Sequence, residues 1–478
     1  MLNGRAKAME ADNKKELFEN MPVPRAITVM AVPTIISQLI NVVYNVVDTF
    51  FIGRTGNSYM VASVTVAFTL FMMTIAFSNL FGIGGGSLAA RLLGQGRGDE
   101  ARSVSAFSFY GALAIALLYS LLTGLFLDPL LKLLGASSAT VGYARQYVWL
   151  VVILGSVPII LSAVGAHLLR NLGYSRQASI GLSGGGILNI ILDPIFMFVL
   201  LPAGWEVFGA ALATLISNIC SCIYMLIVLN RVSGAAFLSI NPAHIRNVRK
   251  ENVKEVFAVG VPSAVLTGLF DVANIVLNAQ MAIHGDLELA AIGIVMKPER
   301  LPNAINVGIC QGMLPIVAYN YSSGNRERMN QVIRTARTYG LITSVVCVAF
   351  FELFASPVVN IFLDTSAGNV TDALTTIALA AAFLRVRCLA SPVQFLNYHT
   401  SYCLQAMGDG RDTLIHAAVR QLVFYIPFML LFNSFFGVSG LVWALIAGET
   451  CGAVFAMLLL RVWLKRLGAI VMDKTQSE

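Results

Sequence analysis

Two aspartates lie inside long apolar stretches of this 478-residue sequence. Asp48 is near the outer end of the first stretch, and Asp193 is in the fifth. A charged side chain at the centre of a bilayer costs at least about 2.5–3.5 kcal/mol, so those that persist are usually functional or paired. The first half of the chain places no Lys or Arg well inside an apolar stretch. The two carboxylates must therefore be protonated or hold a cation, and either state makes them a switch.

Oxygen-bearing side chains accompany both aspartates at helical spacing. Tyr44 precedes Asp48 by one turn, Asn189 precedes Asp193 by one turn, and Thr214 lies in the next stretch. Carboxylate, amide and hydroxyl oxygens suit a small hard cation or a shared proton. We therefore predict a coupling site for H⁺ or Na⁺ at Tyr44, Asp48, Asn189, Asp193 and Thr214, with Na⁺ held by the last four of these residues.

The helix around Asp193 carries two further signals. Pro194 removes a backbone hydrogen bond, and Gly184, Gly185 and Gly186 predict a loosened helix with free carbonyls. The alternative is that Asp193 and Pro194 mark only a kink, and that Asp48 caps the outer end of its helix. Both interpretations remain open on the sequence alone.

The second half of the chain has charges of both signs in or near its apolar stretches. A Pro-interrupted patch, residues 296–300, lies in the eighth stretch, and two arginines are two residues apart in the tenth, so they face different sides. These charges either line a cleft or form structural ion pairs. The candidates for a cleft are Asp271, Lys297, Glu299, Arg300, Arg385 and Arg387.

The elements that must position these residues are transmembrane helices. The chain is 57% hydrophobic and only 12% charged, about half the charged fraction of a soluble domain. Its apolar runs are too long for barrel strands. We predict an all-α polytopic membrane protein with twelve spans, near 26–52, 59–85, 103–127, 142–169, 178–201, 206–229, 253–283, 289–317, 331–355, 372–403, 412–433 and 437–463.

The basic residues give the orientation. Most Lys and Arg residues fall in the termini and in alternate loops, whereas the remaining loops contain only Arg54 and Lys132. This asymmetry follows the positive-inside rule and predicts a multi-pass protein of the cell membrane with both termini in the cytoplasm. The net charge of +7 therefore reflects the cytoplasmic leaflet rather than a nucleic-acid partner.

The two halves of the chain resemble each other. An offset of 229 residues aligns Val32-Pro33 with Val261-Pro262, and an offset of 226 aligns Gly86 with Gly312. Six spans per half predict two six-helix lobes related by a pseudo-two-fold axis along the membrane normal. We expect a cytoplasmic segment at 1–24, an N-lobe at 25–230, a cytoplasmic linker at 231–252, a C-lobe at 253–464 and a cytoplasmic tail at 465–478.

These residues resemble the multidrug and toxic compound extrusion (MATE) family over residues 20–465. The resemblance rests on the spacing of Pro33, Tyr44, Asp48, Gly53 and Gly56. It rests also on three runs, which are Gly94-Gln95-Gly96-Arg97-Gly98-Asp99, Leu188-Asn189-Ile190-Ile191-Leu192-Asp193-Pro194 and Gly209-Ala210-Ala211-Leu212-Ala213-Thr214.

The resemblance implies a secondary antiporter that exports organic, often cationic, compounds in exchange for H⁺ or Na⁺ by alternating access. In the DinF-like branch of the family the N-lobe acidic pair forms the cation site. The NorM-like branch invokes a C-lobe acidic cluster. Asp271 could belong to such a cluster, but Arg385 and Arg387 occupy the span where that branch has an acidic residue. The chain is therefore closer to the DinF-like branch.

Related proteins that flip lipid-linked precursors give an alternative, which predicts a basic cleft built from Lys297, Arg300, Arg385 and Arg387. An enzyme is not expected, because no catalytic constellation stands out. A nucleotide is not expected either, because Gly82–Ser87 lacks the Gly-Lys-Ser/Thr ending of a phosphate loop. The expected partners are small organic substrates and the lipid bilayer, with no cofactor, for a chain that acts as a monomer.

Overall fold

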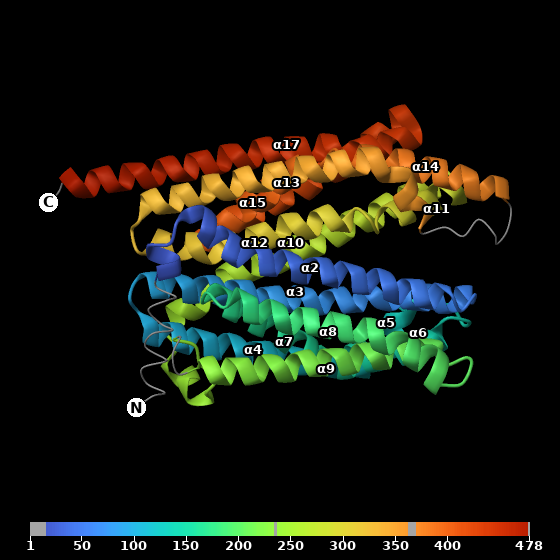
Figure 1. The fold of residues 1–478 in the computed structure, drawn as a ribbon, viewed down its shortest axis with the longest axis horizontal. Coiled ribbons are helices and arrows are strands. Elements are labelled where there is room, and N and C mark those ends of the chain that lie inside the picture. The colour runs from blue at the N-terminus through green and yellow to red at the C-terminus, as the bar shows by residue number, and fades with distance from the viewer. Residues whose placement is uncertain (1–15, 234–236, 362–369, 477–478) are drawn as a thin grey trace. The chain divides into compact units, whose positions relative to one another are not determined.

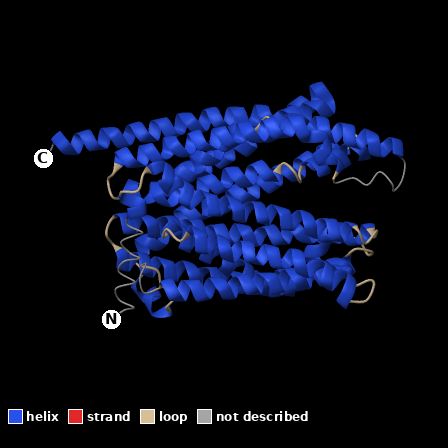
Figure 2. Cartoon of the chain, viewed as in Figure 1, coloured by secondary structure: helices blue, strands red, loops and turns tan. Residues whose placement is uncertain are grey.

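The computed structural model describes residues 16–233, 237–361 and 370–476. Within these ranges every regular element is helical and no strand is present (Figure 2). The all-α prediction is therefore confirmed. The expected N-terminal segment, linker and C-terminal tail each lie partly outside the described residues.

The first half of the chain forms long helices with short connections (Figure 1). Several contain π-helical turns, which are often found at functional sites in helices. The elements are α2 (Val23–Gly53), α3 (Ser58–Gly94), α4 (Gly98–Leu125), α5 (Leu127–Leu133), α6 (Val141–Val148), the π-helix η1 (Trp149–Leu154), α7 (Ser156–Asn171), α8 (Ser175–Ile195), the π-helix η2 (Phe196–Leu200) and α9 (Glu206–Val232).

The second half has more breaks. The charged patch at 296–299 forms a turn that divides one predicted span into α11 and α12, as its proline suggested. The elements are the 3₁₀-helix η3 (Pro242–Asn247), α10 (Lys250–Ala282), α11 (Asp286–Val295), α12 (Arg300–Ser322), α13 (Arg326–Asn360), α14 (Val370–Cys388), α15 (Ser391–Met407), α16 (Gly410–Ala418), the π-helix η4 (Val419–Tyr425) and α17 (Ile426–Gln476).

The described helices agree with twelve spans. Nine helices are long and apolar enough to cross a membrane, and two bent pairs raise this number to 11. One of the nine, Gly410–Lys465, contains 56 residues and is interrupted at Gly437, where the backbone leaves the helical region (φ 57°, ψ −139°). Division at Gly437 gives the twelfth span, at the place where the hydropathy pattern separates 412–433 from 437–463.

The chain forms two compact units. Unit 1 comprises the described residues of Met1–Gly268 together with Gln311–Val332 and Gln405–Gly408. Unit 2 comprises Leu269–Cys310, Ile333–Leu404 and the described residues of Asp409–Glu478. Three segments from the second sequence repeat thus pack within unit 1.

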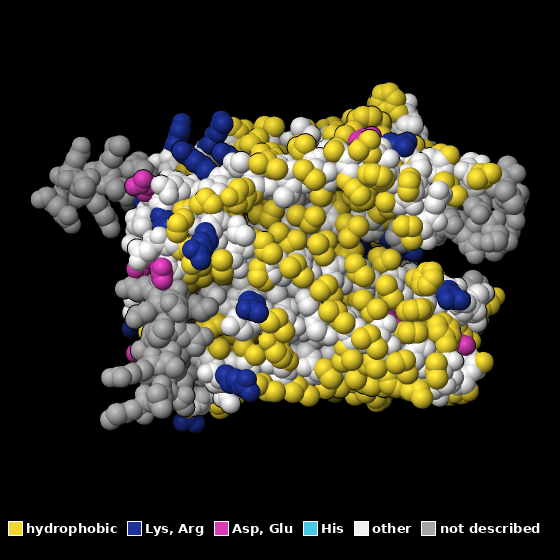
Figure 3. Space-filling model, in the orientation of Figure 1, with side chains coloured by type: hydrophobic (Ala, Val, Ile, Leu, Met, Phe, Trp, Pro, Cys, Tyr) yellow, Lys and Arg dark blue, Asp and Glu magenta, His cyan; other side chains and the backbone are white. Residues whose placement is uncertain are grey.

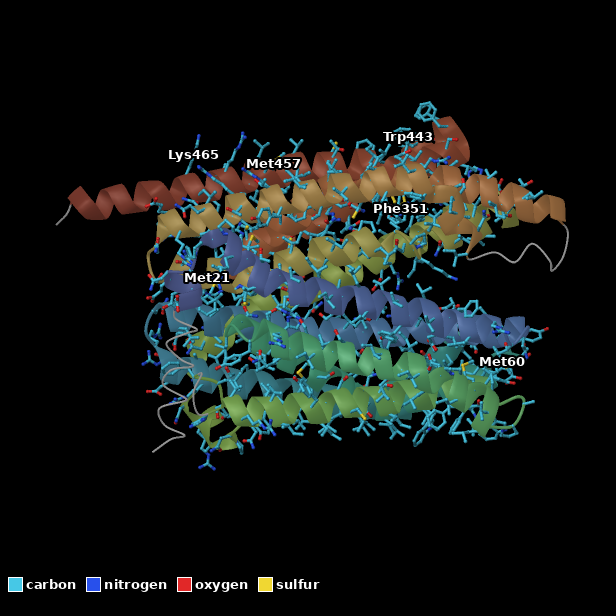
Figure 4. All side chains as sticks on the ribbon, viewed as in Figure 1. Met21, Met60, Phe351, Trp443, Met457 and Lys465 are labelled. Atoms are coloured by element: carbon cyan, nitrogen blue, oxygen red, sulfur yellow. The ribbon has the colours of Figure 1, made fainter. Side chains whose placement is uncertain are left out.

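Unit 1 is held together by apolar packing between long helices. Helix α2 packs against α8, α3 against α4 and α7, and α8 against α9 (Figure 1). One apolar core cluster surrounds Phe81, Leu168 and Met225, and a second surrounds Ile52, Leu131 and Val151. Met21 and Met60 lie near opposite ends of these helices (Figure 4). The helices that carry the predicted site residues therefore belong to one packed body.

Unit 2 has its own apolar core, around Leu277, Leu384 and Leu441. In this unit α11 packs on α14, and α14 packs on α17. Large apolar side chains are also exposed on the outside of the helices, such as Leu121 (58%) and Val346 (62%). Figure 3 shows that hydrophobic side chains cover much of the face that it draws. An apolar exterior suits lipid as the surrounding solvent.

Candidate functional site

The predicted site residues of the first half lie together inside unit 1. Asp193 is fully buried, and Asn189 (2%), Thr214 (5%) and Asp48 (9%) are nearly so. Tyr44 is half-buried. Asp48 lies on α2, Asn189 and Asp193 on α8, and Thr214 on α9. Because α2 and α9 both pack against α8, three helices bring these oxygens to one place.

Asn189 is the centre of the hydrogen-bond network. Its Nδ2 donates to Asp193 Oδ1 at 3.0 Å and to Thr214 Oγ1 at 3.3 Å. On α9, the backbone carbonyl of Thr214 accepts a hydrogen bond from Asn218 Nδ2 at 2.8 Å. The amide nitrogen of Asn189 is thus occupied within the cluster, which leaves its carbonyl oxygen available to another group.

Three buried oxygens of this cluster have no hydrogen-bond partner in the described structure, namely Asp48 Oδ1, Asn189 Oδ1 and Asp193 Oδ2. The two carboxylates are close enough to interact electrostatically. No described Lys or Arg forms an ion pair with either of them. Two adjacent carboxylates without a cationic partner need a proton or a metal cation between them. The donor set, all oxygen, fits a hard cation.

The glycine run on α8 has a different role from the one predicted. Helix α8 continues through Gly184, Gly185 and Gly186, so these glycines do not break it, and the regular α-helix changes to the π-helix η2 only at Phe196, after Pro194. A Cβ at Gly186 would lie 3.0 Å from Ile40 Cγ2 and 3.4 Å from the Tyr44 ring. A Cβ at Gly185 would lie 2.0 Å from Ser221 Oγ on α9. The glycines therefore permit close helix packing, as small residues do in membrane proteins.

The alternative interpretation of Asp48 as a helix cap is also wrong. Helix α2 continues to Gly53, and its C-cap is Arg54. Asp48 is thus an interior residue of the helix, almost one and a half turns before its end. A carboxylate buried in this position needs a proton or a cation, and its electrostatic neighbour Asp193 has the same need.

One member of the cluster was not predicted from the sequence. Tyr147 of α6 is 6% exposed and interacts electrostatically with Asp48, Tyr44 and Asp193. A lone tyrosine in an apolar span is usually a packing residue, and nothing in its spacing connects it to aspartates on other helices. Only the packed structure brings α6 to the site.

The charges of the second half separate into two groups. Glu299 and Arg387 form a buried ion pair with two contacts, Nε to Oε2 at 2.8 Å and Nη2 to Oε1 at 3.1 Å. Arg385 points elsewhere, and its Nε donates to the Glu352 carbonyl at 3.3 Å. The expectation that the two arginines face different sides of their helix is confirmed. Arg387 is engaged in a structural pair, which weakens its candidacy for a cleft.

The other three candidates lie near the break between α11 and α12. Arg300 is exposed, Lys297 and Asp271 are half-buried, and Arg300 interacts electrostatically with both of the others. This group mixes one carboxylate with two cations within unit 2. A role for it in substrate binding stays a prediction.

A second buried ion pair in unit 2 was visible in the sequence only as isolated charges. Arg420 Nη2 and Glu449 Oε1 are 2.7 Å apart, and both side chains are at most 2% exposed. Asn397 Nδ2 donates to Glu449 Oε2 at 2.7 Å, and His416 Nε2 lies 3.1 Å from Asn397 Oδ1. Arg420 belongs to η4, whose π-helical turn places it toward the interior. Unit 2 therefore pairs its deep charges, whereas the described part of unit 1 leaves its two deep carboxylates together.

Comparison with known proteins identifies the class. The MatE family model matches residues 33–195 and 262–431, so each sequence repeat matches it once. This chain belongs to the MATE family of membrane transporters. It is 31% identical over 458 residues to the multidrug export protein MepA of Staphylococcus saprophyticus, which covers 95% of this chain and 97% of that protein. It is 30% identical, with the same coverage, to the MepA protein of Staphylococcus aureus strain NCTC 8325.

Solved structures share the fold. An outward-facing multidrug resistance MATE family transporter of the MOP superfamily matches with a TM-score of 0.87 at 24% identity, over 95% of this chain and 98% of that one. A Pyrococcus furiosus transporter of the MOP superfamily, whose binding pocket is described as reversed in polarity, matches with a TM-score of 0.87 at 23% identity and the same coverage. These structures have twelve helices in two lobes, which confirms the predicted fold class.

Proposed function

We propose that this chain is a secondary antiporter of the cell membrane that exports small organic compounds, often cationic ones, in exchange for H⁺ or Na⁺. The buried oxygens of Asp48, Asn189 and Asp193 that lack partners carry the proposal. The curated relatives named as multidrug export proteins support the substrate class. The proposal includes both termini in the cytoplasm and a monomer as the working unit.

The geometry suggests how the ion acts. Asp48 lies on α2 and Asp193 on α8, so two ionised carboxylates repel each other across a helix contact. A bound Na⁺ would be held by Asp48, Asn189, Asp193 and Thr214, and a proton would be shared by the two carboxylates with Tyr44 beside them. Either one removes the repulsion and favours close packing of α2 on α8. The ion therefore stabilises one conformation of α2, and substrate stabilises another.

The flippase alternative has less support. It calls for a basic cleft from Lys297, Arg300, Arg385 and Arg387, but Glu299 neutralises Arg387 and Asp271 lies near Arg300. A pyrophosphate would then meet at most a mixed group of charges. Drug export remains the function that the site supports best.

The decisive experiment is transport by purified protein in proteoliposomes. An organic cation is loaded, and its efflux is followed under an imposed Na⁺ gradient and then under an imposed pH gradient. We expect one gradient to drive efflux, and we expect Asp193→Asn to abolish the gradient-driven part. Asp128→Asn is the matched control, because Asp128 forms an exposed ion pair with Arg145. That variant should transport as the parent does.

The proposal fails if neither gradient drives efflux of any organic cation tested. The assignment of the coupling site fails if Asp193→Asn keeps full gradient-driven efflux. If the parent protein instead moves a lipid-linked pyrophosphate between leaflets without an ion gradient, the flippase alternative replaces the proposal.

A further inference from the structure

Arg91, near the end of α3, is 5% exposed and contacts two segments of the second sequence repeat. Its Nη2 lies 3.0 Å from Glu255 Oε2 on α10. Its Nη1 donates to the carbonyls of Gln405 and Ala406, each at 3.4 Å, at the end of α15. All of these residues belong to unit 1. One buried guanidinium thus joins α3 of the first repeat to two helices of the second.

The end of α15 is shaped to receive this guanidinium. The last carbonyls of a helix have no partner within the helix and carry a partial negative charge, so a cation is favourable there. Gly408, just beyond the end of α15, adopts a left-handed conformation with φ +87°. A Cβ at Gly408 would lie 2.8 Å from Arg91 Cζ. Glycine therefore both ends the helix and leaves room for Arg91.

A second arginine repeats this arrangement. Residues 16–19 form a short helix before α2. Arg328, in the first turn of α13, donates through Nε to the Phe18 carbonyl at 2.7 Å and through Nη2 to the Met21 carbonyl at 2.6 Å. Leu17 and Phe18 are each 3% exposed, and Phe18 stacks on Tyr319 with ring centroids 5.0 Å apart. The segment before α2 is thus fastened to the second repeat.

Two close backbone crossings accompany these contacts in unit 1. A Cβ at Gly260 of α10 would lie 2.0 Å from the Leu80 carbonyl of α3, and one at Gly312 of α12 would lie 2.6 Å from Ala31 Cα of α2. Ala31 and Gly260 are equivalent in the two repeats, because each directly precedes a Val-Pro pair. The first repeat therefore meets segments of the second by the same kind of contact twice.

We propose that Arg91 and Arg328 form a latch that closes the cytoplasmic end of unit 1 and opens once in every transport cycle. The inference rests on the proposed function, because alternating access requires the two repeats to separate at each end in turn. The side chain of Glu255 is 53% exposed, so water can replace Arg91 as its partner when the latch opens. Arg91 binds carbonyls in the last turn of α15, and Arg328 binds carbonyls within and just after the short helix 16–19, so these contacts can break while the helices stay folded.

Hydrogen–deuterium exchange of the full chain in lipid nanodiscs tests the latch. We expect Arg91→Met to raise exchange about tenfold at the start of α10 and around residues 404–409, because local opening controls exchange there. Arg328→Met should do the same at residues 16–21. Arg102→Met is the matched control at the same end, since Arg102 pairs with the exposed Asp99 on its own helix and lies over the Phe237 ring. It should leave all these segments unchanged.

Two milder variants guard against misfolding. Glu255→Gln removes the ion pair alone, and Arg91→Lys keeps the charge but loses the forked donors that reach Glu255 and the α15 carbonyls together. Both should give the Arg91→Met pattern. The latch is refuted if these variants leave exchange at 404–409 unchanged, or if Arg91→Met raises exchange equally around Asp193. If the parent protein shows no transport, the proposed function is refuted. The exchange result still tests the contacts of the latch separately.

Discussion

The buried pair of Glu299 and Arg387 gives the sharpest test of how this protein uses charge. In Glu299→Gln, Arg387 would keep its charge at 3% side-chain exposure without its carboxylate partner. Breaking a buried ion pair on one side costs roughly 3–5 kcal/mol, because an uncompensated charge stays in a poorly solvated place. Total stability is commonly about 5–15 kcal/mol, so this loss is a large part of it. We therefore expect Glu299→Gln to destabilise the protein severely.

The assay is equilibrium unfolding of the purified protein in lipid or mild detergent, with a denaturing detergent as titrant. The double variant Glu299→Met with Arg387→Met removes both charges and leaves apolar side chains of similar length. Replacement of a whole buried pair is often neutral or stabilising. The double variant should therefore recover most of the stability that the single variant loses. Asp128→Asn, which breaks an exposed pair, should cost at most about 1 kcal/mol.

Two results would refute this reasoning. If Glu299→Gln unfolds at the same titrant concentration as the parent, Arg387 is solvated and the pair does not stabilise unit 2. If the double variant is as unstable as the single one, the loss comes from packing and not from the uncompensated charge. Transport adds a further criterion, because a stable double variant that no longer transports would assign the pair to the substrate path.

Three further outcomes follow from the proposed coupling site and from the buried Arg420–Glu449 pair. Tyr147→Phe removes one hydroxyl beside the two carboxylates, so it should change the ion concentration that gives half-maximal transport. The variant should lose only about 1 kcal/mol of stability. An unchanged ion dependence would exclude Tyr147 from the site. Gly186→Val should slow transport, because the larger side chain would push α2 away from α8. Gly184→Val is the control and should not slow transport, because a Cβ at Gly184 has no neighbour within 4 Å. Equal effects of the two variants would refute the packing argument. Glu449→Gln should destabilise by roughly 3–5 kcal/mol in the same unfolding titration, and full stability would show that Arg420 finds another partner.

Hydropathy predicted the spans well because it reports what a bilayer selects. It predicted 59–85 for α3, which extends from Ser58 to Gly94, because helices continue past the apolar layer. It could not show the 47° bend between Val141–Leu154 and Ser156–Asn171, since a bent pair is as apolar as a straight helix. The break at 296–299 was predictable because Pro298 and its charged neighbours interrupt the apolar pattern.

The candidate site was predictable only in part. Asn189 and Asp193 are one turn apart, so local geometry was enough to connect them. Their closeness to Asp48 depends on the packing of α2 on α8, which no spacing encodes. The Glu299–Arg387 contact spans 88 positions and could not be separated in the sequence from a pair of charges lining a cleft. The proposed latch could not be predicted for the same reason, because in the sequence Arg91 is only one of many basic residues on the side predicted to be cytoplasmic.

The two repeats share an architecture but treat charge in opposite ways. In the described part of unit 2, Arg387 and Arg420 each neutralise a buried glutamate through two contacts. In unit 1 the two buried aspartates have each other as neighbours, so loss of a cation or a proton produces repulsion directly. Under the proposed function, ion binding would therefore act on helices through the second arrangement. We therefore expect the coupling ion to act on α2 and α8, with unit 2 as the more rigid of the two bodies.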